Sequence, residues 1–333
     1  MIEPLALSLG DPAGVGPELI VEAWARREAG SLAPFLVAGG GTIIAAAARA
    51  RGIDAPAITI AGPGEAAQAF THGIPVLGDN DGEYRPGEPS PEGARLALAS
   101  LELGARLAAE GEVSALVTGP VAKARLAKVG FAHPGQTEFV AEACGYAPVD
   151  VAMMLAGPSL RTVPVTIHIP LSQVSSQLTS AAIERRGRIA AMGLMRDFGI
   201  ASPRLAVCAL NPHAGEEGRM GDEEQHVIVP AIEALRAEGI DVTGPHAADA
   251  LFAPRNRDTF DVAICMYHDQ ALIPLKALDF DHGVNVTLGL PIIRTSPDHG
   301  TAFGIAGKRL ADPGATIAAI RMAGECALRR AGR

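Results

Sequence analysis

Three histidines follow short apolar runs of the kind that form buried strands, and this repeated context points to a metal centre. His168, His213 and His268 each lie at or just beyond the end of such a run. If the three strands are neighbours, the imidazoles can converge on one divalent ion and leave coordination positions open for a ligand. Asn211 and Asp269 are placed to fix a ring orientation. The alternative is three unrelated, hydrogen-bonded histidines at strand ends, which the threefold repetition disfavours.

Lys276, Asn285 and Arg294 form a second group of residues whose chemistry suits a ligand. One lysine, one asparagine and one arginine on neighbouring loops could hold a phosphate ester. Taken singly, a lysine or an arginine is more often a solvated surface group. Arg294 is the more suggestive of the two cations because it ends the apolar run 290–293.

Two glycine-rich segments are candidates for binding an anion or a nucleotide. The segment 10–18 follows the first apolar run and opens a helix. Its glycines allow close backbone approach, and a helix N-terminus favours an anion. Because it matches neither the GxGxxG fingerprint nor a P-loop, a tight turn and a direct ligand contact are both open. The segment 295–308 is long with little periodicity, and it suits a nucleotide or phosphate, with a plain surface loop as the alternative.

Alternating strands and helices must position these residues. That alternation predicts an α/β fold with a largely parallel sheet, in which ligands bind at the carboxyl ends of the strands. The polar, turn-rich segment 78–91 is expected to be a loop. The predicted strands span 4–9, 34–38, 57–60, 113–118, 151–155, 162–168, 204–209, 261–266 and 284–288. The predicted helices span 17–28, 42–51, 91–110, 137–144, 179–198, 223–238 and 314–330.

Composition excludes several classes of protein. The 333 residues carry 28 Lys and Arg against 37 Asp and Glu, a net charge of −9. This charge, without a basic run, argues against nucleic acid as a partner. No apolar run approaches the roughly 18 residues of a membrane-spanning helix. The N-terminal segment lacks signal-peptide features, and the four cysteines show no CxxC spacing, so we expect a cytoplasmic protein with reduced thiols.

Taken together, these segments resemble the 4-hydroxythreonine-4-phosphate dehydrogenase (PdxA) family. The resemblance covers nearly the whole length in order. The opening 10–18 and the loop that begins at His299 also look like the wider isopropylmalate and isocitrate dehydrogenase group, in which that loop holds the adenosine end of the nicotinamide cofactor. The matching blocks are 10–18, 118–123, 135–138, 168–171, 211–216, 267–276 and 289–308.

The resemblance implies an architecture of two α/β/α lobes around a cleft, like that of isocitrate and isopropylmalate dehydrogenases. A cofactor-binding lobe would comprise 1–127 and 295–333. A lobe for the metal, the substrate and dimerisation would comprise 128–294. The resemblance also implies a homodimer in which the metal site is completed across the subunit interface.

The resemblance further assigns site residues. It implies that His168, His213 and His268 bind a divalent metal, which would be Zn, Mg or Co. Position 136 is usually His in the family but is Gln136 here, and glutamine donates a hydrogen bond without carrying charge. The implied substrate residues are Gln136, Thr137, Lys276, Asn285 and Arg294. The implied cofactor residues are Asp298, His299, Gly300, Gly304, Gly307 and Lys308.

The implied reaction is oxidation of 4-phosphooxy-L-threonine, a small phosphorylated hydroxy amino acid, by NAD or NADP. The metal would bind the amino group and the C3 hydroxyl and lower the pKa of that hydroxyl. The resulting 3-oxo acid would lose CO2 and give 3-amino-2-oxopropyl phosphate, a step of pyridoxine 5′-phosphate biosynthesis. The general base is not identified, and the candidates are Asp249 and Asp269, with Lys123 as another.

Three alternatives remain at this stage. A sister dehydrogenase of sugar-acid catabolism, acting on 4-phospho-D-erythronate or 4-phospho-D-threonate, would use the same motifs, and Gln136 keeps it open. A metal-dependent phosphatase or aldolase would use the three histidines without a cofactor, which the loop 295–308 disfavours. A non-catalytic sensor of phosphometabolites would not need metal, phosphate and cofactor positions together.

Overall fold

The computed structural model describes residues 2–332, and the chain divides into two compact units. Unit 1 comprises Met1–Pro148 and Leu290–Arg333, and unit 2 comprises Val149–Gly289. The chain therefore leaves unit 1 and returns to it. The unit boundaries follow Pro148 and Gly289, whereas the resemblance put the lobe boundaries after residues 127 and 294. Gln136, Thr137 and Arg294 consequently belong to unit 1.

Unit 1 contains a parallel sheet whose order is β3-β4-β2-β1-β5-β12. Its inner strands are apolar apart from Ser8, and every residue of β1 and β2 is buried. Such runs are typical of strands that helices cover on both faces. The strands are β1 Leu5–Ser8, β2 Phe35–Ala38, β3 Ala57–Ile60, β4 Ile74–Leu77, β5 Ala115–Val117 and β12 Arg294–Pro297.

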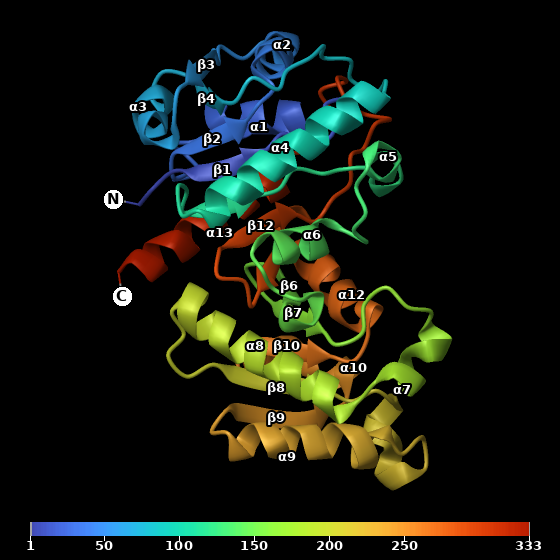
Figure 1. The fold of residues 1–333 in the computed structure, drawn as a ribbon. Helices are drawn as coiled ribbons and strands as arrows, with labels where there is room; N and C mark the ends of the chain where they lie inside the picture. Colours follow the sequence, from blue (N-terminus) through green and yellow to red (C-terminus); the bar gives the residue numbers. More distant parts are fainter. Residues whose placement is uncertain (1, 333) are drawn as a thin grey trace. The chain divides into compact units, whose positions relative to one another are not determined.

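The helices of unit 1 pack on this sheet, and Figure 1 shows α4 crossing the front of β1 and β2. Helix α4 begins where the sequence predicts, because Ser90 Oγ accepts the N–H of Gly93 at 3.1 Å and Pro91 occupies the first turn. The helices are α1 Gly16–Ala25, α2 Gly41–Arg51, α3 Ala66–Phe70, α4 Pro91–Ala109, α5 Lys123–Leu126, α6 Gln136–Ala143 and α13 Gly314–Ala331.

Unit 2 contains a mixed sheet whose order is β11-β6-β7-β10-β8-β9. Neighbouring strands from β7 to β9 run parallel, as predicted, whereas β6 pairs antiparallel with both β7 and β11. The strands are β6 Ala152–Ala156, β7 Arg161–Pro164, β8 Arg204–Cys208, β9 Asp241–His246, β10 Val262–Cys265 and β11 Val284–Leu288.

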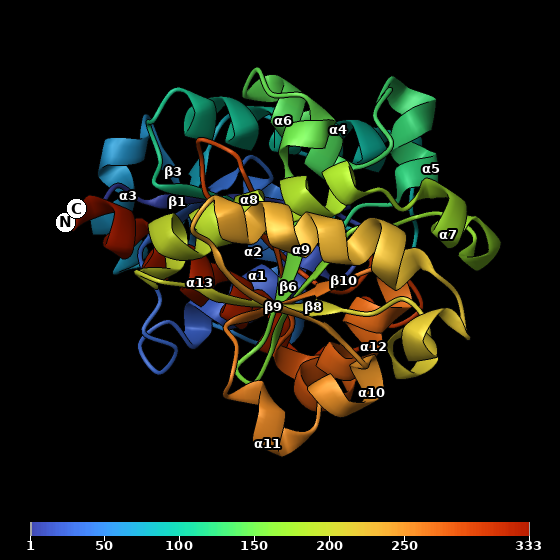
Figure 2. The ribbon, with the colours of Figure 1, turned by 90° about the horizontal axis from the view of Figure 1, so that it is seen from below.

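Helices cover both faces of this second sheet. Figure 2 shows α8 and α9 on one face of the strands and α10 and α12 on the other. A π-helical turn, Glu224–Ile228, leads into α9. Within residues 2–332, no helix is both long and apolar enough to cross a bilayer. The helices are α7 Val174–Gln177, α8 Ser180–Phe198, α9 Val229–Ala237, α10 Ala248–Leu251, α11 Pro254–Arg257 and α12 His268–Asp279.

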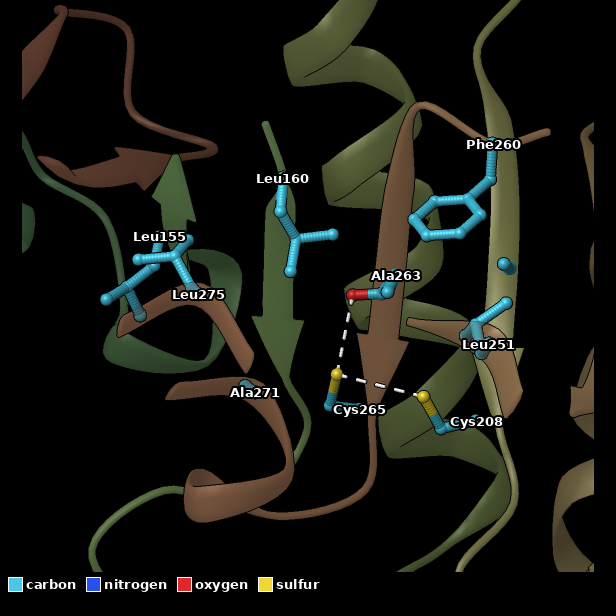
Figure 3. Packing of buried hydrophobic residues seen from close by; sticks show 10 residues of the cluster. Leu155, Leu160, Cys208, Leu251, Phe260, Ala263, Cys265, Ala271 and Leu275 are labelled. Carbon is cyan, nitrogen blue, oxygen red and sulfur yellow. Dashed lines mark hydrogen bonds between the residues drawn. The ribbon is translucent and has the colours of Figure 1, made fainter. Parts of the chain in front are cut away.

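Buried cysteines form part of the core of unit 2. Cys208 and Cys265 lie on the neighbouring strands β8 and β10, and their Sγ atoms are 3.9 Å apart within an apolar cluster (Figure 3). Burial raises the pKa of the Cys265 thiol well above its usual range. All four cysteines are free, as the sequence predicts.

A strained turn follows β8. The residues from His213 to Glu217 all have positive φ, between 46° and 77°, which is a region that non-glycine residues seldom adopt. The carboxylate of Glu224, which is 3% exposed, fixes the entry to this turn. It accepts the N–H groups of Leu210 and Asn211 at 2.8 Å each and the Asn211 side-chain amide at 2.9 Å.

Replacing Glu224 should therefore cost stability. We expect Glu224→Ala to lower the free energy of unfolding by about 2–4 kcal/mol, because it leaves buried N–H donors without an acceptor. The exposed neighbour Gln225 provides the control. We expect Gln225→Ala to change the free energy of unfolding by less than about 0.5 kcal/mol. Denaturant titration measures both. Equal stabilities of the two variants would contradict this role of Glu224.

Candidate active site

The predicted metal-binding histidines all follow strands at the centre of unit 2. Because β10 lies between β7 and β8 and pairs parallel with both, the carboxyl ends of the three strands meet at one edge of the sheet. His168 follows β7, His213 follows β8 and His268 follows β10. The neighbour relation that the sequence analysis needed is thus present.

Two of these histidines lie close together. The ring centroids of His168 and His268 are 5.8 Å apart. His268 is the first residue of α12, and its Nδ1 lies 2.7 Å from Asp269 Oδ1. An ionised carboxylate only accepts, so Nδ1 carries the proton and the lone pair on Nε2 is available to a metal. This contact is the one that an orienting role of Asp269 would require.

His213 occupies the strained turn held by Glu224 and is exposed. Within residues 2–332, no group of three His, Cys, Asp or Glu side chains is close enough to hold a metal ion. A single chain therefore brings two of the three predicted ligands together. The imidazole pair fits a divalent ion as two ligands of a larger set.

Arg294 is a buried cation of unit 1. It opens β12 and is 4% exposed. Its Nη2 donates to Thr118 Oγ1 at 2.7 Å, and its Nη1 lies 3.4 Å from Thr137 Oγ1. Burial lowers its pKa to about 10, against an opposing effect of the Glu138 carboxylate. Arg294 is therefore still a cation at neutral pH.

Gln136 and Thr137 form the first turn of α6, beside Arg294. The Gln136 amide donates to the carbonyl of Gly119 at 3.1 Å, and its Oε1 lies 3.4 Å from Arg294 Nη2. Gln136, which the resemblance implies as a substrate residue, thus contacts the Arg294 guanidinium. The helix N-terminus adds a partial positive charge to that of Arg294, which makes this part of unit 1 suited to an anion.

Lys276, Asn285 and Arg294 were expected on neighbouring loops, but none of them lies on a loop, and Asn285 lies in the strand that the sequence predicted at 284–288. Lys276 lies on α12 and Asn285 on β11, both in unit 2, and Arg294 lies on β12. The Oδ1 atom of Asn285 is buried without a hydrogen-bond partner among the described residues. Such an acceptor suits a hydroxyl or ammonium group of a ligand better than it suits a phosphate.

The predicted cofactor loop is shorter than expected, because Arg294–Pro297 forms β12. No helix or strand covers residues 298–313. This segment contains the six implied cofactor residues. A Cβ added to Gly300 or Gly304 would meet no described atom within 4 Å, whereas Gly307 has φ +74 and lies against Pro86.

A large hollow lies beside α4. It encloses about 790 Å³ and is lined by residues of the segment 81–96 together with Pro12 and Ala13. That volume lies in the range of small-molecule sites, roughly 300–1,000 Å³. Because Pro12 and Ala13 line it, the hollow borders the glycine-rich turn 10–18.

Asp249, the other candidate for the general base, is exposed on α10.

The sequence analysis did not identify Thr118, which accepts a hydrogen bond from Arg294, or Glu224, which holds the turn that contains His213. Thr118 was quoted only as part of a matching block, although its place at the end of an apolar run was a usable signal. Glu224 gives no such signal, because only the fold buries its carboxylate against a distant backbone segment.

Comparison with known proteins identifies the family of this chain. Residues 31–323 match the model of the family described as pyridoxal phosphate biosynthetic protein PdxA. The chain is 61% identical to the 4-hydroxythreonine-4-phosphate dehydrogenase of Erythrobacter litoralis, over 98% of both chains.

Solved structures show the same relation. The crystal structure of 4-hydroxythreonine-4-phosphate dehydrogenase from Klebsiella pneumoniae superposes with a TM-score of 0.87 at 37% identity, covering 98% of this chain and 99% of that one. A terephthalate 1,2-cis-dihydrodiol dehydrogenase from Burkholderia xenovorans gives a TM-score of 0.67 at 31% identity, covering 96% and 97%. The predicted α/β fold and family are confirmed, and this chain belongs to the PdxA family.

Proposed function

We propose that this chain oxidises 4-phosphooxy-L-threonine at C3 with NAD or NADP, in pyridoxine 5′-phosphate biosynthesis. The product would be a 3-oxo acid that loses CO2 to give 3-amino-2-oxopropyl phosphate. The structural observation that carries the proposal is the buried Arg294 beside the first turn of α6. A buried cation at a helix N-terminus suits a phosphate monoester, and highly identical relatives carry the name of this dehydrogenase.

For the substrate, Arg294 and Thr137 would hold the phosphate, with Gln136 keeping the guanidinium in place. Lys276 would add a second cation. Asn285 would accept a hydrogen bond from the amino or hydroxyl group through its buried Oδ1.

For the metal, His168 and His268 would provide two ligands and His213 the third. Support comes from the neighbouring strand ends and from the 5.8 Å between the first two rings. A divalent Zn, Mg or Co ion would supply Lewis-acid stabilisation of the oxygen at C3. Because one chain brings only two of the rings together, we infer a homodimer whose interface completes the site.

For the cofactor, residues Asp298, His299, Gly300, Gly304, Gly307 and Lys308 would hold the adenosine end. Support comes from the irregular backbone of 298–313 and its open glycines. NAD or NADP would accept the hydride from C3. The proton of the C3 hydroxyl would go to a carboxylate, for which Asp249 stays a candidate, while Asp269 would orient His268.

For the compartment, the free cysteines support the reducing cytoplasm.

Reduction of the nicotinamide, followed by absorbance, tests the proposed activity. We expect reduction of NAD or NADP with 4-phosphooxy-L-threonine and a divalent metal, and none after treatment with a chelator. The parallel reaction with 4-phospho-D-erythronate is the substrate control. Reduction with the erythronate alone would overturn the substrate and favour the sugar-acid enzyme. Absence of reduction with either would favour a metal-dependent phosphatase or aldolase.

Loss of Arg294 should act on substrate binding. We expect Arg294→Ala to raise KM for the phosphorylated substrate roughly 10- to 100-fold, because a charge-assisted hydrogen bond is lost, with a smaller effect on kcat. Arg106→Ala, which removes an exposed ion-paired arginine from α4, is the control and should leave KM unchanged. An unchanged KM in Arg294→Ala would remove Arg294 from the phosphate site.

A further inference from the structure

Gln270 joins the chain segments that follow two neighbouring strands of unit 2. It lies in the first turn of α12 and is 8% exposed. Its Oε1 accepts the N–H of Met266, which follows β10, at 2.7 Å. Its Nε2 donates to the carbonyl of Ala209, which follows β8, at 2.8 Å. One buried side chain therefore links the two segments beyond the last residues that pair in the sheet.

Thr166 extends this link to a third strand. It follows β7 and is buried. Its Oγ1 donates to the carbonyl of Met266 at 2.7 Å, and its N–H donates to the same carbonyl at 3.2 Å. The N–H of Met266 thus bonds to Gln270 and its carbonyl to Thr166. We call these hydrogen bonds among Thr166, Ala209, Met266 and Gln270 the strand-end network.

Each segment that the strand-end network holds carries one histidine of the proposed metal centre. Those histidines are exposed or half-buried, whereas the residues of the network are buried. Opening one of the network's hydrogen bonds would leave a buried polar group without a partner, so the bonds resist displacement of the segments. The network residue and the histidine that follows it are Thr166 and His168, Met266 and His268, and Ala209 and His213.

We propose that Gln270 and Thr166 are positioning residues that hold the three histidine-bearing segments in register for one divalent metal ion. Their polar side-chain atoms bond to backbone groups, so their effect on a metal would pass through the histidines. Loss of contacts that orient metal ligands weakens metal binding by roughly 10- to 100-fold. This inference rests on the proposed function, since the metal-binding role of the histidines belongs to it.

Thr162 provides a matched control for a purely structural effect. It lies within β7 and is fully buried, and its Oγ1 donates to the carbonyl of Ala271 at 3.1 Å. It therefore makes the same type of buried hydrogen bond from the same strand. Unlike Thr166, it lies where β7 still pairs with β10, before the segment that carries His168.

Four substitutions test the inference. Thr166→Val removes the hydroxyl at similar volume, whereas Thr166→Ser keeps it. Thr162→Val removes the control hydroxyl in the same way. Gln270→Met removes both hydrogen bonds of Gln270 at similar volume, and Thr166→Val keeps the test decisive if Gln270→Met does not fold.

The first readout is calorimetric titration of the metal-free variants with Zn²⁺. We expect the affinity to fall at least roughly tenfold in Gln270→Met and Thr166→Val. It should stay within about twofold of the wild type in Thr166→Ser and Thr162→Val. Denaturant titration should show similar losses of stability in Thr162→Val and Thr166→Val, because each loses one buried hydrogen bond. Unchanged affinity in Gln270→Met and Thr166→Val, or an equal loss in Thr162→Val, would overturn the positioning role.

The second readout is hydrogen exchange of the metal-free protein. Exchange in the peptides covering 207–214 and 264–269 should rise roughly tenfold in Gln270→Met, because the segments are no longer joined. Unchanged exchange would contradict the anchoring of these segments. A wild type that binds no Zn²⁺ would refute the proposed metal centre, and with it the positioning role. A wild type that binds Zn²⁺ but reduces no nicotinamide would refute only the proposed reaction, and weaker Zn²⁺ binding by the variants would still support the positioning role.

Discussion

Parallel pairing of β10 between β7 and β8 is the constraint on which the candidate site depends. It sends three chain segments out of one edge of the sheet, and each segment carries a histidine. Unit 1 has the same arrangement, because β5 pairs parallel with both β1 and β12. The glycine-rich turn follows β1, the segment that contains Thr118 follows β5, and the segment 298–313 follows β12. Asp11 N–H donates to the Pro120 carbonyl at 2.9 Å, so a hydrogen bond joins the segments that follow β1 and β5. Residues far apart in the sequence become neighbours because parallel strands end together.

Buried charges do most of the positioning at these edges. Arg294, Glu18 and Glu224 are each almost or entirely removed from solvent, and each contacts a group outside its own helix or strand. Removing a charge from water is costly unless hydrogen bonds compensate for it. Glu224 holds a backbone turn, Glu18 pairs with Arg51, and Arg294 donates to the hydroxyl of Thr118 and lies 3.4 Å from the side-chain oxygen of Gln136. The groups that compensate Glu224 and Arg294 are backbone N–H groups and neutral side chains, so these two charges fix local geometry.

Much of the fold follows from the sequence pattern, since apolar runs predicted strands such as 57–60 and 284–288 with their observed bounds. The missed elements break that pattern with proline or polar residues. Strand β9 contains Gly244 and Pro245 and lies at the edge of its sheet, where a missing donor is tolerated. Strand β12 is polar, and α12 contains Pro274, so both were read as loops. The histidines were singled out because their context recurs, whereas the hydrogen bonds of Glu224 depend on tertiary structure that no local pattern encodes.

Calorimetric titration of metal-free protein with Zn²⁺ tests the central claim most directly. That claim is that the histidines that follow β7, β8 and β10 form a metal centre. We predict about one equivalent per chain in the wild type, and binding at least roughly tenfold weaker in His168→Ala, His213→Ala and His268→Ala, because each removes one ligand. His226→Ala, an exposed histidine on the π-helical turn, should bind like the wild type. Unchanged affinity and stoichiometry in the three ligand variants would contradict the metal centre.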